Sequence, residues 1–330
     1  MGKNNTYRRQ NDTETKDRFA VSKKVLFIAV LVVTNIFTVG FIFYNNRSDA
    51  VRVFNNPFPL VDMARSFLAQ EHFLSTIKPA RKEMKQIVSD YEKKGNRIGV
   101  YFEFLNTGAN VSINQDERFW PASLSKMPTV FAVMKKVEEG EWKLTNELVL
   151  FSEDQDGRFG ELYKKTPGTR FTIEELLKET LINSDNTAHS ILVRNLSSED
   201  YTDIFEALGM EELFDQNYDI TAKEYSRIFR SLYTASYLNR ENSQKILKWL
   251  SETKFNEFLG AGVPPEVLFS HKIGEEFEQV VFLDSGIIYI PNRPVLITVM
   301  VEVKEGGDVT VAQEIMRELS KAAYTYVANN

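Results

Sequence analysis

Three serine–lysine pairs with the spacing Ser-x-x-Lys are the first residues of this chain whose types and spacing could do chemistry. Because residues i and i+3 share one face of a helix, such a pair can place a nucleophilic hydroxyl beside an amine that accepts its proton. The spacing alone does not say which pair is functional. The three pairs are Ser75 with Lys78, Ser123 with Lys126, and Ser251 with Lys254.

Ser123 has the setting that an activated serine needs. It follows a strand-like region and a Trp-Pro-Ala turn, and it opens a predicted helix. The first turn of a helix offers free backbone N–H groups and positive potential to a developing oxyanion. Burial and the same helix end favour the neutral, proton-accepting form of Lys126. Ser75 instead precedes a proline-broken segment and Ser251 falls in a polar helical region, so we expect Ser123 and Lys126 to be the functional pair.

Two further motifs follow Ser123 in the sequence. The stretch "LINSDNTA" contains Ser184-Asp185-Asn186, and "SHKIG" contains Lys272-Ile273-Gly274 at the edge of a predicted strand. Alone, the first is ordinary turn and helix-capping chemistry and the second is a strand end. The neighbouring His271 is interpreted as a strand residue that faces away from the site. Ser-x-x-Lys, Ser-Asp-Asn and Lys-x-Gly in this order form a far more specific pattern than any one of them.

From about residue 98 to residue 327 the chain resembles the class A β-lactamases and penicillin-binding serine hydrolases. Beyond the three motifs, "LNTGANVSINQDERFWPASLSKMPT", "PGTRFTIEELLKETLINSDNTA" and "VVFLDSGIIYIPNRPVLITV" are similar to the corresponding segments of that family. The resemblance implies an α/β (α+β) fold: an antiparallel sheet flanked by N- and C-terminal helices, with an all-helical subdomain and the site in the cleft between them.

The resemblance also implies a role for each motif residue. Ser123 would be the acylated nucleophile and Lys126 its proton acceptor. Ser184 would relay a proton to the leaving nitrogen, Asn186 would bind the substrate amide, and Lys272 would direct positive charge at Ser184 and the substrate carboxylate. No metal or organic cofactor is needed.

The remaining motif positions have implied backbone or structural roles. The backbone N–H groups of Ser123 and Glu275 would form the oxyanion hole. A side chain at Gly274 would crowd a ligand lying along the strand. Asp185 is interpreted as a structural residue that holds its loop.

Three departures from the family pattern bear on turnover. The run "LGMEELFDQNYDIT" has no Glu-Pro and is too short for the loop that carries the deacylating glutamate, and Glu211 and Glu212 fit a surface helix end better. The deacylating base is therefore unassigned. Ile273 stands where the family has threonine or serine, and we expect it to cost about 1–3 kcal/mol of carboxylate binding. Ser285 stands where many class A enzymes have an arginine, which removes a second carboxylate partner.

Composition excludes several other classes of protein. The chain has 330 residues, a net charge of −6 and no long basic run, so nucleic acid is not an expected partner. With no cysteine there can be no disulfide, thiol catalysis or thiolate metal site. The three histidines, His72, His189 and His271, are too scattered to indicate a metal site.

The N-terminal part predicts a membrane anchor. Residues 25–44 are almost wholly apolar, and about 20 such residues span a bilayer core of about 30 Å. Lysine and arginine dominate the preceding flank, which predicts a cytoplasmic tail at 1–24 and an extracytoplasmic remainder. A helical stalk at 45–79 and a hydrolase domain at 80–330 would follow.

Periodicity predicts how the domain is assembled. A helix is expected from Ala80 to Lys94, then a hairpin in which Ile98, Val100, Phe102 and Phe104 alternate with polar positions. A helix from Ser123 to Val137 opens a mostly helical stretch, and Thr172 is an expected helix start. The last third returns to strands and ends in one more helix. Strands at both ends predict a single sheet with a helical insertion.

The expected function is that of a membrane-anchored serine hydrolase that forms a covalent acyl-enzyme with β-lactams or with the D-Ala-D-Ala amides of peptidoglycan stem peptides. One alternative is a penicillin-binding D,D-carboxypeptidase with slow deacylation. Another is a non-catalytic cell-wall binding relative, which Ile273 and Ser285 favour and the intact motif side chains oppose.

Overall fold

The structure is a computed structural model that describes residues 58–61, 78–209 and 217–329. The chain divides into two units, Met1–Asn56 and Pro57–Asn330, and all described residues lie in the second. The predicted tail at 1–24 and membrane segment at 25–44 lie outside the described residues, as does most of the predicted stalk. Within the described ranges no helix is long and apolar enough to cross a membrane. Residues 58–61 of the predicted stalk pack on the domain, where Leu60 N–H donates to Gln244 Oε1 at 2.8 Å.

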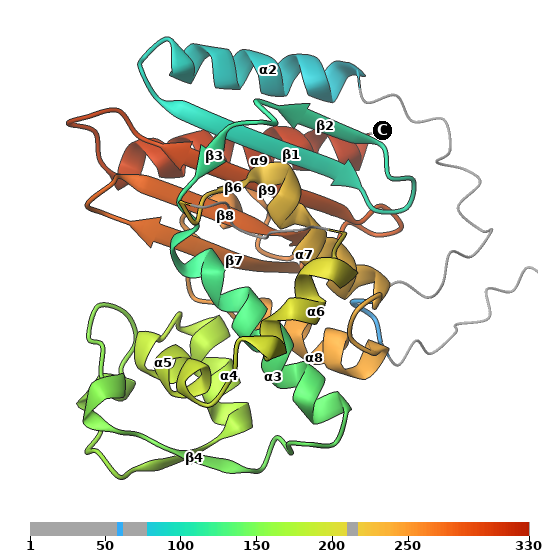
Figure 1. The fold of residues 1–330 in the computed structure, drawn as a ribbon. Helices are drawn as coiled ribbons and strands as arrows, with labels where there is room; N and C mark the ends of the chain where they lie inside the picture. The colour runs from blue at the N-terminus through green and yellow to red at the C-terminus, as the bar shows by residue number, and fades with distance from the viewer. Residues whose placement is uncertain (1–57, 62–77, 210–216, 330) are drawn as a thin grey trace, which may run out of the picture. The chain divides into compact units, whose positions relative to one another are not determined.

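One five-stranded antiparallel sheet forms the centre of the domain, in the order β2-β1-β9-β8-β7 (Figure 1). Its strands come from both ends of the domain sequence, as the strand pattern predicted. β1 and β9 pair along their full length, from Arg97 opposite Glu302 to Phe104 opposite Val295. The strands are β1 (Arg97–Phe104), β2 (Asn110–Ile113), β7 (Phe269–Glu276), β8 (Val281–Ile288) and β9 (Val295–Glu302).

Helices cover both faces of this sheet. One face packs against α2 (Lys78–Glu92) and α9 (Val309–Asn329), with Ile98, Val100 and Phe102 of β1 in the buried cluster between them. α7 (Ala222–Thr234) packs against the other face, on β1, β8 and β9. The alternation of β1 therefore places every second side chain under the terminal helices.

The helical subdomain lies beyond α7 and adjoins one edge of the sheet (Figure 1). One short strand pair, β4 (Glu147–Val149) with β5 (Arg170–Thr172), belongs to it, and another, β3 (Arg118–Phe119) with β6 (Ile220–Thr221), lies beside the main sheet. Thr172 caps α4 and exchanges bonds with Glu175, which confirms the predicted helix start. The helices are α3 (Lys126–Glu138), α4 (Ile173–Ile182), α5 (Asn186–Arg194), α6 (Glu199–Ala207) and α8 (Arg240–Leu250).

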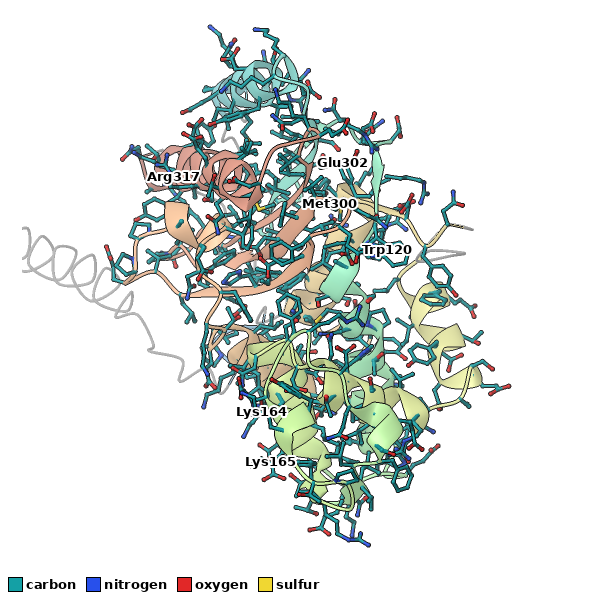
Figure 2. The ribbon with its side chains drawn as sticks, turned by 90° about the vertical axis from the view of Figure 1, so that its left-hand side faces the viewer. Trp120, Lys164, Lys165, Met300, Glu302 and Arg317 are labelled. Atoms are coloured by element: carbon teal, nitrogen blue, oxygen red, sulfur yellow. The ribbon has the colours of Figure 1, made fainter. Side chains whose placement is uncertain are left out.

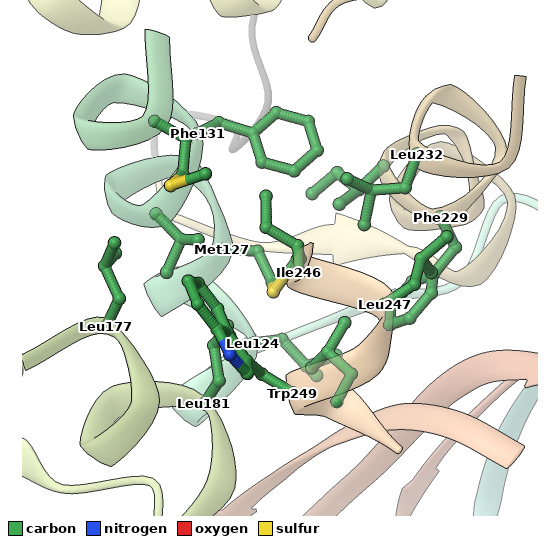
Figure 3. Close-up of a cluster of buried hydrophobic side chains, with 14 of the residues drawn as sticks. Leu124, Met127, Phe131, Leu177, Leu181, Phe229, Leu232, Ile246, Leu247 and Trp249 are labelled. Carbon is green, nitrogen blue, oxygen red and sulfur yellow. The ribbon is translucent and has the colours of Figure 1, made fainter. Parts of the chain in front are cut away.

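Buried side chains from α3, α4, α7 and α8 form the core of the helical part (Figure 3). Leu124, the residue after Ser123, lies in this core together with Met127 and Trp249. Trp120, just before that turn, lies between the strand that carries Met300 and the part of the helical region that carries Lys164 (Figure 2).

The helix predicted from Ser123 begins differently. Residues Ala122–Ser125 form a 3₁₀ turn, η2, and the α-helix starts at Lys126. Pro128 has no N–H to donate to the carbonyl of Leu124, four residues before it. That carbonyl instead accepts a hydrogen bond from the hydroxyl of Tyr225 on α7, at 3.1 Å. The serine thus sits on a tight turn that is anchored from the opposite side of the core.

Candidate active site

Ser123 occupies the strained turn between β3 and α3. It is half-buried, and the preceding Ala122 has a φ of 45°, in the left-handed region that costs energy for a residue with a side chain. The Ser125 hydroxyl donates to the Ala122 carbonyl at 2.7 Å, which holds the turn. Within the described residues the Ser123 hydroxyl has no hydrogen-bond partner, so it is available to a ligand.

Lys126 is the first residue of α3 and only 4% exposed. Its Nζ donates to Asn186 Oδ1 at 2.6 Å, to Ser184 Oγ at 3.2 Å and to the Ser184 carbonyl. The amine is therefore held by the Ser-Asp-Asn segment, 58 and 60 positions away in the sequence. The structure thus brings together the first two motifs that the sequence singled out.

Ser184 lies between two lysine amines. Its Oγ accepts a hydrogen bond from Lys272 Nζ at 2.9 Å and one from Lys126 Nζ at 3.2 Å. Its φ of 52° puts a second strained backbone position at the site. With both lone pairs of the hydroxyl oxygen facing donors, its hydrogen is free to point elsewhere. Ser184 therefore has the geometry of a proton relay.

The two amines compete for charge. Burial lowers the pKa of Lys126 to about 7, although the nearby Asp185 and Asp156 oppose this. Burial, followed by the charge of Lys126, lowers the pKa of Lys272 well below its ordinary value. Two ammonium groups so close together in a buried site repel each other, so one amine tends to be neutral near neutral pH. A neutral amine is what proton abstraction from Ser123 requires.

Asp185 holds the segment in place. Its Oδ1 accepts from Ala188 N–H at 2.8 Å and caps α5, and its Oδ2 accepts from the backbone N–H groups of Glu161 and Leu162 at 2.7 and 2.9 Å. Gly160 lies so close that a Cβ there would be 1.9 Å from Asp185 Oδ2. With its oxygens occupied and its side chain fully buried, Asp185 has the structural position that the sequence indicated.

Gly274 also makes a close approach that the sequence did not predict. A Cβ at this position would lie 2.8 Å from the carbonyl oxygen of Pro121 and 3.2 Å from Leu124 Cγ. The glycine therefore lets β7 pass close to η2, rather than leaving room only for a ligand. This close approach brings the Glu275 backbone alongside the turn of Ser123, as two oxyanion-hole donors require.

Ile273 does not face the site. Side chains alternate along a strand, so Lys272 and Gly274 point to one face and Ile273 to the other. Ile273 is 2% exposed and belongs to the cluster under the terminal helices. Ile273 thus contributes to the core, and its expected cost to carboxylate binding stays a prediction.

His271 and Ser285 are both fully buried in the sheet. His271 shares the face of Ile273, where its ring stacks on Phe269 and Nδ1 lies 2.9 Å from Asp284 Oδ1, so it faces away from the site as interpreted. Ser285 pairs with Lys272 in the strand register, and its Oγ lies 2.6 Å from Thr298 Oγ1. The position that would hold an arginine is thus a small, internally bonded hydroxyl.

The other serine–lysine pairs have no comparable setting. Ser251 ends α8 and its hydroxyl donates to the Lys248 carbonyl at 2.7 Å, which is ordinary helix-end chemistry. Ser75, Glu211 and Glu212 lie outside the described residues. In the described part of the chain no group of acidic, histidine or cysteine residues is arranged to hold a metal ion.

Sequence analysis missed one charged pair beside the site. Arg158 binds the Asp156 carboxylate through side-chain hydrogen bonds, which are the main cause of the lowered pKa of Asp156, and the Asp156 backbone N–H donates to Thr187 Oγ1 at 2.9 Å. Both residues of the pair lie in an irregular loop, and no motif or periodicity marks such a position. The turn sequence "DQDG" was the one available signal, and it indicates only a loop.

Comparisons with known proteins agree with this geometry. Residues 79–327 match the family described as "Beta-lactamase enzyme family". The chain is 24% identical over 263 residues to beta-lactamase VEB-1 of Pseudomonas aeruginosa, covering 72% of this chain and 87% of that protein. It is 28% identical over 153 residues to the D-alanyl-D-alanine carboxypeptidase DacF of Bacillus subtilis, covering 43% and 36% of the two chains.

Solved structures show the same fold. A mutant of PBP-A, in an acyl-enzyme complex with penicillin G, superposes with a TM-score of 0.68 at 21% identity, covering 77% of this chain and 98% of that one. An ancestral class A beta-lactamase superposes with a TM-score of 0.67 at 22% identity, covering 74% and 99%. The predicted sheet with its flanking helices and helical subdomain is therefore confirmed.

Proposed function

Because the chain belongs to the beta-lactamase enzyme family of serine hydrolases, we propose that it forms a covalent acyl-enzyme on Ser123 with β-lactams or with the D-Ala-D-Ala amides of peptidoglycan stem peptides. The observation that carries this proposal is the row of Lys126, Ser184 and Lys272, in which one hydroxyl accepts from two buried amines. Such a row can pass a proton from the amine that accepts it from Ser123 to the hydroxyl that gives one to the leaving group.

The reaction follows from this row. Ser123 Oγ forms a bond to the carbonyl carbon as its proton passes to neutral Lys126, and the backbone N–H groups of Ser123 and Glu275 stabilise the oxyanion. The carbon–nitrogen bond then breaks. The proton moves from Lys126 to Ser184 Oγ while the Ser184 proton passes to the leaving nitrogen. Lys126 is then neutral again and Ser184 is again a hydroxyl. The side-chain amide of Asn186 binds the amide of the acyl part of the substrate.

A substrate carboxylate would set the charge of both lysines. A carboxylate beside Lys272 favours its charged form. A charged Lys272 in turn favours neutral Lys126, because the two amines interact. Binding of an anionic substrate would therefore prepare the proton acceptor. Since Ser285 is bonded to Thr298, Lys272 is the carboxylate partner that we assign.

Slow deacylation is the second candidate behaviour, that of a penicillin-binding D,D-carboxypeptidase. The two carboxylates whose charges act on Lys126 are Asp185 and Asp156. Both are engaged, Asp185 by backbone N–H groups and Asp156 by Arg158. Neither is free to activate water, and the run "LGMEELFDQNYDIT" has no Glu-Pro. We therefore expect a long-lived adduct.

Anchoring in the membrane belongs to the same proposal. Residues 25–44 would span the bilayer, with residues 1–24 in the cytoplasm and the hydrolase domain outside, where β-lactams and stem peptides are met. Fractionation of cells that express the full-length chain tests this. We expect the protein in the membrane pellet and its domain accessible to an external protease. Recovery of the protein in the supernatant alone would contradict anchoring.

The acyl-enzyme is tested by intact-mass measurement of the full-length chain mixed with benzylpenicillin, with Ser123→Ala as the control. An adduct on the wild type alone supports Ser123 as the nucleophile. Rapid decay with accumulating penicilloate would identify a β-lactamase with a base outside the residues assigned here. Persistence supports the D,D-carboxypeptidase candidate. No adduct at any concentration would favour a non-catalytic, cell-wall binding relative.

A further inference from the structure

A second hydrogen bond joins α3 to α5 about one helical turn beyond the site. In the first turn of the two helices, Lys126 Nζ donates to Asn186 Oδ1 at 2.6 Å. Three residues further along each helix, Thr129 Oγ1 lies 3.0 Å from His189 Nε2. Three residues rise about 4.5 Å along a helix axis, and residues i and i+3 share one face of a helix. The two bonds are therefore successive links between the same faces of the same two helices.

Thr129 is the point where three helices meet. Its side chain is 2% exposed, and its Oγ1 also lies 3.2 Å from the hydroxyl of Tyr201 on α6. A hydroxyl donates one hydrogen bond and can accept two, so Thr129 can bond both neighbours whichever tautomer His189 adopts. Because a buried hydroxyl without partners is costly, these bonds specify how the helices pack around Thr129.

His189 makes this link without adding charge to the site. Burial, followed by the charges of Lys126 and Lys272, lowers the pKa of His189 to about 3. The imidazole is therefore neutral at the pH where Lys126 would accept a proton, and it adds no third positive charge beside the two amines. The link between Thr129 and His189 can thus act on the site through the placement of α5.

We propose that Thr129 is a positioning residue for acylation, acting through His189. Its hydroxyl fixes the spacing between α3 and α5, and that spacing keeps the Asn186 amide oxygen on the Lys126 amine. If α5 moved away from α3, the amide oxygen would leave the amine, and both proton transfer and recognition of the substrate amide would suffer. This inference rests on the proposed function of Ser123 and deepens it, because it names a residue that controls the site from behind.

The experiment measures the limiting rate of acylation of the full-length chain by benzylpenicillin, using quenched-flow mass spectrometry. Thr129→Val keeps the shape of the side chain but removes the hydroxyl, and its limiting rate should fall roughly tenfold, because misplacing a reacting group is costly. Thr129→Ser keeps the hydroxyl and loses a buried methyl group, so it should acylate close to the wild-type rate although it unfolds at a lower temperature. A role in packing alone predicts the reverse order of the two acylation rates.

His189→Leu removes the other half of the same bond. Its limiting rate should fall about as far as that of Thr129→Val, and the double variant should be no slower than either single variant, because the two changes remove one interaction. Multiplied losses in the double variant would contradict a role through this bond. Thermal unfolding checks that each variant is folded, and if Thr129→Val is not, Thr129→Ser and His189→Leu decide.

Thr180→Val is the matched control. Thr180 of α4 is also fully buried, and within the described residues its Oγ1 has no hydrogen-bond partner. Its replacement by valine should therefore leave the limiting rate at the wild-type value. Tyr201→Phe is the control for the third helix. It leaves the bond between Thr129 and His189 in place and should acylate close to the wild-type rate.

The outcomes separate the two proposals. A wild type that acylates, together with Thr129→Val and His189→Leu variants that acylate equally fast, would show that Thr129 only fastens the helices and would overturn this inference alone. A wild type that forms no adduct at any concentration would overturn this inference together with the proposed function.

Discussion

Lys126 links the chemistry of the site to its burial. The amine is 4% exposed and bonded to Ser184 and Asn186, and its pKa is lowered to about 7. At the ordinary pKa of about 10.4 only about one molecule in a thousand would have a neutral amine at neutral pH. Desolvation therefore lowers the pKa of Lys126 far enough for a large share of the amine to be neutral, and able to accept a proton, at neutral pH.

The lowered pKa of Lys126 predicts how the acylation rate should change with pH. The active form of Lys126 is neutral, so the acylation rate should rise with pH through about 7 and level off above it. Lys126→Arg keeps a charge that is never lost and should reduce the rate by about 10²- to 10⁴-fold at every pH. Stopped-flow or quenched-flow acylation over pH measures both. If the acylation rate instead rose only near the pKa of a free lysine, Lys126 would not be a proton acceptor with a lowered pKa.

The residues of the three motifs could be predicted from the sequence, because their order and their local setting can be recognised there. Lys126, Ser184, Asn186 and Lys272 do come together, and Ser123 lies on the turn that directly precedes Lys126. Two details of the site could not be predicted from the sequence. The packing of Ile273 depends on which helices cover its face of the sheet, and the pairing of Asp156 with Arg158 beside the site depends on how a loop folds back over α5.

At the scale of elements, the site is an arrangement of one turn against one strand. η2 carries Ser123, and β7 carries Lys272 and the Glu275 backbone. Their close approach is possible because Gly274 has no side chain toward the Pro121 carbonyl. The sequence pattern predicted β7 as a strand, but it predicted an α-helix from Ser123 where η2 forms. It did not predict their contact, because a close approach of two backbones leaves no periodic pattern, and so the glycine was interpreted through a ligand instead.

Gly274→Ala tests this contact. Its Cβ would lie 2.8 Å from a backbone oxygen, so β7 or η2 must move, and we expect a loss of about 1–3 kcal/mol in the free energy of unfolding and at least a tenfold slower acylation. Gly140→Ala is the comparison. That glycine has a φ of 81° with nothing within 4 Å of a Cβ, so alanine should cost about 1–2 kcal/mol of stability but leave acylation intact. Equal acylation by both variants would show that the contact does not position the site.

At the scale of the whole domain, a polar network fastens the helical part to the sheet. Glu103 of β1 is buried and accepts hydrogen bonds from Arg230 of α7 and from the Tyr101 hydroxyl, which itself accepts from Arg230 at 2.7 Å. A salt bridge whose acid is buried is costly to break, because the remaining charge loses its partner.

Glu103→Gln should therefore destabilise the domain. We expect a loss of about 1–3 kcal/mol, below the range for fully buried pairs because the Arg230 side chain is 38% exposed. Glu302→Gln removes the exposed pair with Arg97 and should change stability by less than about 0.5 kcal/mol. Urea unfolding of both variants measures the difference. Equal losses would mean that the Glu103 network does not join the two parts.

The pairing of β1 with β9 has a consequence for how the protein is made. Arg97 and Glu302 are 205 positions apart, yet their strands are neighbours in the middle of the sheet. During synthesis Ser123, Lys126 and the Ser-Asp-Asn segment leave the ribosome long before β7 and β9 exist, so β1 and β2 must wait without their central partner. The site is therefore completed among the last steps of biogenesis, and a nascent chain would carry its nucleophile for nearly half of its synthesis without the strand that completes the site.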